Sequence, residues 1–113
     1  MKTLADFKRR LKVGVNLHTI YHQKFSGNRD EKGQPLYTDE DKGIREISIV
    51  KSTQFAIKTT KSDGTIVDSW CAYPTTKNLI IVDENTVTIL EPDWREKDDK
   101  KRKLIPILTH KFI

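Results

Sequence analysis

The sequence has little of what metalloproteins, nucleotide-binding enzymes and membrane proteins require. Its single cysteine excludes a disulfide within the chain, so nothing calls for an oxidising compartment. Its five glycines are isolated and match neither a dinucleotide-binding nor a P-loop spacing. No stretch approaches the roughly 18 apolar residues of a membrane span, and the first residues lack the apolar run of a signal peptide. We therefore expect a cytoplasmic protein that has no membrane partner.

Residues able to carry out chemistry are also sparse. His18 and His22 would share a metal ion on a helix, but the segment is predicted to be extended, where they lie about 13 Å apart. No catalytic pattern surrounds Cys71, which is more typical of a small packed side chain. The acidic residues 39–41 have Lys42 beside them, as expected of a solvated cluster. The sequence thus predicts no enzyme, no metal, no cofactor and no small-molecule substrate.

What the chain does contain is a series of short strand patterns. Residues 44–50 and 54–59 alternate in polarity, with Phe55 and Ile57 predicted to face inward and Ala56 and Lys58 outward. The Asp-Gly pair in residues 62–64 predicts a hairpin turn that leads into a strand over 65–73. A second hairpin is predicted from residues 78–82 and 86–90.

The two ends of the chain add a helix and a last strand. Thr3 and Asp6 have the spacing of a helix N-cap, Leu4, Phe7 and Leu11 share one helical face, and Gly14 provides a stop. A strand is predicted over residues 17–22, and a last one over 104–109, where Pro106 favours an edge position or a bulge. Residues 24–43 are rich in charge and glycine, which predicts a long loop or a hairpin-like excursion.

These patterns predict a single domain over residues 1–113, large enough to fold without disulfides or metal. The expected fold class is mainly β, or β-rich α+β, with one short N-terminal helix. A small antiparallel SH3-like or OB-like barrel, or a rolled sheet, is the first expectation. An open α+β sheet is the second.

The net charge of +5 is unevenly distributed. Residues 1–15 carry +4 and residues 93–103 carry +2, whereas residues 24–43 carry −1 and the strand-rich remainder is neutral. A local cluster of this kind is what phosphate contacts require, and it makes the helix residues candidates for nucleic-acid binding: Lys8, Arg9, Arg10 and Lys12. The alternative is a solvated helix face with no particular partner.

Two aromatic residues in the central strand are candidate binding anchors. The alternation around Trp70 and Tyr73 leaves open which of them faces the core, so we expect one to pack inside and the other to contribute to the surface. An exposed aromatic residue of this kind is a common anchor for a protein partner.

The pattern of Phe7, Leu11 and Gly14, then residues 45–52 with Phe55, then residues 69–74, resembles a group of small uncharacterised proteins of phages and integrated mobile elements in Gram-positive bacteria. The resemblance spans most of residues 4–90. It implies an accessory protein that binds nucleic acid or a host or phage protein.

Three functions follow from these observations. The first is a non-enzymatic module that binds the nucleic-acid phosphate backbone. The second is a protein-binding accessory or inhibitor module that uses residues 24–43 and the Trp70 and Tyr73 surface. The third is a structural or assembly role with edge pairing through residues 104–109.

Overall fold

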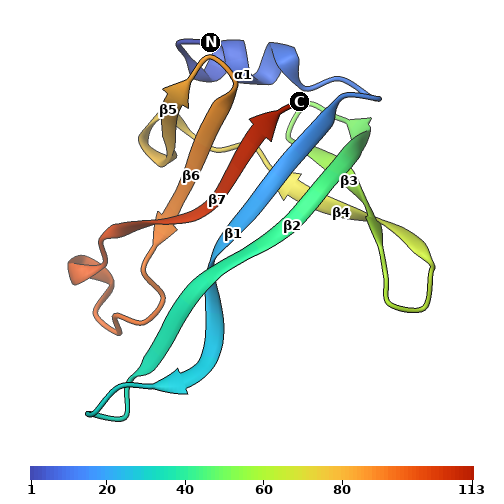
Figure 1. The fold of residues 1–113 in the computed structure, drawn as a ribbon. Helices are drawn as coiled ribbons and strands as arrows, with labels where there is room; N and C mark the ends of the chain where they lie inside the picture. The colour runs from blue at the N-terminus through green and yellow to red at the C-terminus, as the bar shows by residue number, and fades with distance from the viewer.

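The computed structural model describes all 113 residues, which form one seven-stranded antiparallel sheet and one α-helix (Figure 1). The strand order across the sheet is β4-β3-β2-β1-β7-β6-β5. No helix of the chain is long and apolar enough to cross a membrane. The elements are α1 (Leu4–Arg10), β1 (Asn16–Arg29), β2 (Pro35–Val50), β3 (Gln54–Thr60), β4 (Ile66–Ala72), β5 (Leu79–Asp83), β6 (Thr86–Pro92) and β7 (Leu104–Phe112), with two 3-10 turns at Thr76–Asn78 and Asp99–Lys101.

The predicted mainly β class with one short helix is confirmed. The sheet is not closed into a barrel, because β4 and β5 are its two edges and do not pair with each other. Both predicted hairpins are present, since β3 pairs with β4 and β5 pairs with β6.

Helix α1 begins at the predicted cap. The Thr3 hydroxyl accepts a hydrogen bond from the Asp6 backbone N–H, and the Asp6 carboxylate accepts one from the Thr3 N–H, which completes a capping box. Phe7 is fully buried and Leu11 nearly so, as their spacing predicts. Phe7 meets the Phe112 ring edge-on at 5.9 Å between centroids, which holds the helix against the C-terminal end of β7.

The core lies between α1 and one face of the sheet. It is a cluster of eight buried hydrophobic residues drawn from the helix, from the turn after it and from five strands: Phe7, Leu11, Leu17, Ile47, Phe55, Ile57, Val87 and Phe112. The predictions that Phe55 and Ile57 face inward and that Ala56 lies on the opposite face are confirmed, although Ala56 is fully buried as well. Ala56 is the cross-strand partner of Trp70, whose much larger side chain covers it.

Residues 24–43 do not form a loop. They belong to β1 and β2, which continue past the core as a two-stranded arm and turn at residues 30–34 (Figure 1). The turn is closed by hydrogen bonds from Asp30 N–H to the Gln34 carbonyl and from Gly33 N–H to the Asp30 carbonyl, with Gly33 at φ 78°. The loop prediction is therefore wrong, while the hairpin-like alternative is confirmed.

The pairing of β7 with β1 ends at Leu108, so Pro106 has a neighbouring strand only on the β6 side, which fits the expected edge position, although β7 lies inside the sheet from Leu108 onward. There β7 lies between β1 and β6, and Leu108 and Thr109 pair on both sides. The expectation of a bulge is confirmed as well, because the β6–β7 register shifts between Ile89 and Leu90, and Pro106 lies opposite Leu90 at this bulge. The expected edge pairing through residues 104–109 therefore has no free edge at Leu108 and Thr109.

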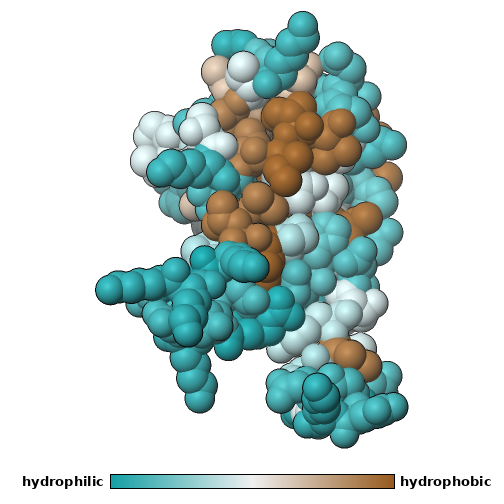
Figure 2. Space-filling view, turned by 90° about the vertical axis from the view of Figure 1, so that its left-hand side faces the viewer, coloured by the Kyte–Doolittle hydropathy of each residue, from teal (hydrophilic) through white to brown (hydrophobic).

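The edges that the sheet does expose are β4 and β5. Strand β5 has two exposed aliphatic side chains, Ile80 and Val82. Figure 2 shows the side of the molecule on which β5 lies, with hydrophobic side chains gathered in its upper half and hydrophilic ones below.

Candidate functional site

Strand β4 presents its two candidate anchors differently. Trp70 lies on the outer face and is 44% exposed. Tyr73 follows the strand, stacks on the buried Phe55 ring at 5.8 Å and donates its hydroxyl to the Lys51 carbonyl at 2.7 Å. The expectation of one packed and one exposed aromatic is confirmed.

The structure joins these aromatic residues to the basic helix. Lys8 Nζ lies 5.1 Å from the centroid of the Tyr73 ring, and Lys51 Nζ lies 5.3 Å from the centroid of the Trp70 ring. The hydrogen bond from Tyr73 to Lys51 links the two pairs. Lys8, Tyr73, Lys51 and Trp70 thus form one chain of contacts that runs from the helix to the outer face of β4, and we call it the Lys8–Trp70 surface.

The other basic residues of the N-terminal segment are placed differently. Arg9 forms an ion pair with Asp6, one turn earlier on the helix. Arg10 packs its guanidinium 4.2 Å from the centroid of Phe112 and donates to the Glu84 carbonyl at 2.6 Å. Lys12 is exposed just after the helix. Of the four predicted phosphate contacts, Arg10 therefore joins the helix to the β5–β6 turn, and the charge of Arg9 is balanced.

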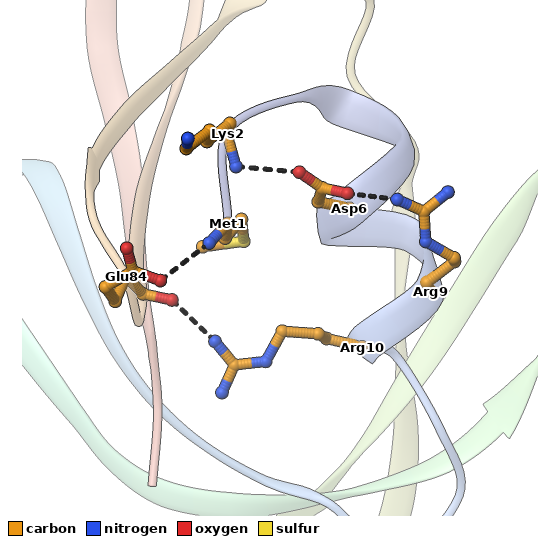
Figure 3. A pocket seen from close by; sticks show the side chains of 6 residues that line it. All are labelled: Met1, Lys2, Asp6, Arg9, Arg10 and Glu84. Atoms are coloured by element: carbon orange, nitrogen blue, oxygen red, sulfur yellow. Dashed lines mark hydrogen bonds and ion pairs between the residues drawn. The ribbon is translucent and has the colours of Figure 1, made fainter.

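A hollow of about 380 Å³ lies beside this end of the helix (Figure 3). Its polar groups are engaged with one another: the α-amino group of Met1 contacts Glu84 Oε2 at 2.9 Å, and the Lys2 N–H donates to Asp6 at 2.8 Å (Figure 3). The hydrogen bond from Lys2 is the largest cause of the lowered pKa of Asp6. These internal pairs join the chain start to the helix and to the β5–β6 turn.

The two histidines considered as metal ligands, His18 and His22, each contact an aspartate instead. His18 Nε2 lies 2.7 Å from Asp41, and His22 Nδ1 lies 2.9 Å from Asp39, so each histidine faces its own acidic partner across the β1–β2 pair. No group of three or more histidine, cysteine, aspartate or glutamate side chains is arranged to hold a metal ion.

Cys71 packs partly buried against the core, and burial raises the pKa of its thiol. We expect Cys71→Ser to lower the free energy of unfolding by about 1–3 kcal/mol, because a hydroxyl replaces a sulfur at an apolar position. The affinity of the protein for a nucleic-acid or protein partner should be unchanged. A thiol reagent should label the native protein far more slowly than the denatured protein. Rapid native labelling with loss of binding in the variant would show a functional thiol instead.

An aromatic and cationic cluster on the arm was not predicted. Tyr37 of β2 meets the Trp94 ring edge-on at 5.9 Å and lies 6.4 Å from Phe25 of β1. The Arg95 guanidinium lies 4.8 Å from the Tyr37 centroid and 5.2 Å from the Trp94 centroid. Phe25 and Trp94 are 44% and 46% exposed. The cluster joins residues nearly 60 positions apart, which no local pattern reveals.

The sequence analysis also did not predict a buried polar side chain on the core face of the sheet, His110. His110 is fully buried, shares a 2.8 Å hydrogen bond with Thr19 through Nδ1, and leaves Nε2 without a partner. Burial, with a smaller effect from the positive charge of Arg45, lowers the pKa of His110 to about 4. The alternation of His110 and Phe112 with the outward Thr109 and Lys111 was the available signal for its burial.

No model of a known protein family matches this chain, and no curated protein or solved structure matches it significantly.

Proposed function

We propose that the protein is a non-enzymatic module that binds single-stranded nucleic acid on the Lys8–Trp70 surface. The observation that carries the proposal is the continuous line of contacts from Lys8 through Tyr73 and Lys51 to the exposed Trp70. Proteins that bind single strands combine cationic side chains, which contact phosphates, with aromatic rings, on which bases stack.

The roles of the four side chains follow from their contacts. The packed Tyr73 ring has Phe55 stacked against it and Lys8 within cation–π distance, so it positions Lys8 and leaves little ring for a base. Trp70 is the exposed ring and supplies the stacking platform. Lys8 and Lys51 would contact the phosphates on either side of that base. An OB-like or SH3-like arrangement of the strands is part of what we propose. It would support this function, because OB folds bind single strands on an antiparallel sheet.

We expect a fluorescently labelled single-stranded oligonucleotide to bind more weakly as salt rises from about 50 to 200 mM, because phosphate contacts release counterions. Lys8→Ala and Lys51→Ala should each flatten the plot of log K against log salt by about 0.7. Trp70→Ala should cost about 1–3 kcal/mol of binding at constant salt. Fluorescence anisotropy measures all three effects.

Lys32→Ala provides the matched control, because Lys32 is an exposed lysine at the tip of the arm, far from the surface in question. This variant should leave the salt slope unchanged. If no oligonucleotide binds at the lower salt, or if Lys32→Ala and Lys8→Ala have equal effects, the proposed site is wrong.

A second candidate function, binding of a protein partner, is favoured by the projecting arm. Its exposed aromatic residues, Phe25 and Trp94, surround the half-buried Tyr37, and aromatic residues with arginine are enriched in interface hot spots. If this function holds, Trp94→Ala should weaken capture of a partner by about 2 kcal/mol or more. Trp70→Ala should leave capture unchanged. Affinity measured by surface plasmon resonance with a partner purified by the wild-type protein would separate the two, and the reverse order of effects would exclude the arm.

A further inference from the structure

Strands β2 and β3 separate to form a notch in the sheet. Their pairing ends at Ile47 and Ile57, after which β2 continues along β1 into the arm while β3 stays paired with β4 (Figure 1). The notch forms an open pocket of about 730 Å³. Its lining includes three cationic side chains, from Lys42, Arg45 and Lys58, and the hydroxyls of Thr59 and Ser69.

Arg45 is the one cation of the notch that has no acidic partner. Lys42 forms an ion pair with Glu40, and Lys58 lies 3.2 Å from Glu46. Arg45 instead donates through Nη1 to the Thr59 hydroxyl at 3.0 Å, and its Nε is buried without any partner. A half-buried guanidinium in this state loses solvation and gains no compensating charge.

A second buried nitrogen near Arg45 also lacks a hydrogen-bond partner. The His110 side chain lies on the same face of the sheet, and its Nε2 is the other buried polar atom without a partner. Both nitrogens therefore lack a partner within the chain and are open to a further hydrogen bond. The positive charge of Arg45 contributes to the lowered pKa of His110 and opposes the rise in the pKa of Cys71.

The two carboxylates that line the notch, from Glu40 and Asp41, have partners other than Arg45. Asp41 accepts hydrogen bonds from His18 at 2.7 Å and from the Gly43 N–H at 2.7 Å. Glu40 contacts Lys42 and, at 3.3 Å, Lys24. Neither carboxylate contacts Arg45, and the charge of Glu40 is balanced by its two lysine partners.

We propose that Arg45 binds a free tetrahedral oxyanion, such as inorganic phosphate, in the notch between β2 and β3. The guanidinium supplies charge and fixed N–H donors, a geometry that suits phosphate oxygens. The Thr59 and Ser69 hydroxyls lie beside it and share a 2.7 Å hydrogen bond, so that when Thr59 donates to Ser69, the Ser69 hydroxyl can donate to the anion. This site is separate from the Lys8–Trp70 surface and does not depend on nucleic-acid binding.

The test is thermal unfolding in rising inorganic phosphate, with chloride at matched ionic strength as the reference. The Tm of the wild-type protein should rise by roughly 4–8 °C once phosphate exceeds its Kd several-fold, and should then increase with the logarithm of the phosphate concentration. Arg45→Met should abolish the rise, whereas Lys61→Met, at an exposed lysine of the β3–β4 turn, should retain it. An equal response to chloride, or a full response in Arg45→Met, would overturn the proposal.

Ser69→Ala keeps the proposal testable if Arg45→Met does not fold. Loss of one hydrogen bond to a charged ligand should weaken phosphate binding about ten-fold in a calorimetric titration. Unchanged affinity in Ser69→Ala would remove the hydroxyl pair from the site and contradict the proposed geometry.

Discussion

Replacing Phe7 by alanine is expected to lower the free energy of unfolding by about 3–5 kcal/mol, close to the whole stability of some small domains. Phe7 is fully buried, is the one fully buried side chain of α1, and meets Phe112 edge-on. Its loss leaves a cavity between the helix and the sheet and releases the element that carries Lys8. Urea unfolding followed by circular dichroism measures the change.

Val13→Ala is the matched control, because Val13 is 65% exposed in the turn after the helix. It should change stability by no more than about 0.5 kcal/mol. If Phe7→Ala proves as mild as the control, the helix does not depend on this contact and the packing described for α1 is wrong.

Acidification is expected to destabilise the protein through His110. The pKa of this side chain is about 4 in the folded state, because burial disfavours its charged form, against about 6.5 when exposed to solvent. Between these values the unfolded chain binds the proton and the folded chain does not, so stability is complete above pH 6.5 and falls as the pH drops toward 4. The total loss from this group is on the order of 3 kcal/mol.

His110→Gln isolates this effect, since glutamine fills a similar volume and does not titrate. Stability of both proteins measured by urea unfolding at intervals from pH 7 to pH 4 should show a steep fall for wild type and a shallow one for the variant. The lowered pKa values of Asp6 and Asp41 affect stability mainly below pH 4, and they act equally on wild type and variant. Parallel profiles would mean that His110 is not buried in its neutral form.

The sequence predicted the elements that have one buried face. The α1 cap, the inward Phe55 and Ile57 and the two hairpins each leave a local pattern, since burial on one side imposes a period of 3.6 or 2. The arm has no such pattern, because both its faces are largely solvated and β1 and β2 support each other there. Its charges and glycines therefore resembled a loop.

The candidate site was predictable only in part. The sequence pointed to Lys8, Trp70 and Tyr73 separately, but the contact between the helix and β4 is a property of the fold. Sequence alone also gave no reason to separate Arg10 from Lys8, although Arg10 is bound to the Glu84 carbonyl, more than 70 residues away. Pairing across such distances depends on strand order, which hydrophobic periodicity does not encode.

The most direct test of the proposed function is a titration of the 15N-labelled protein with a short single-stranded oligonucleotide, observed by two-dimensional NMR. We expect the largest chemical-shift changes at the Trp70 indole N–H and at the backbone amides of Lys8 and Lys51, and we expect raised salt to reverse them. Changes confined to the arm around Phe25 and Trp94, or no changes in excess oligonucleotide, would contradict the proposed function.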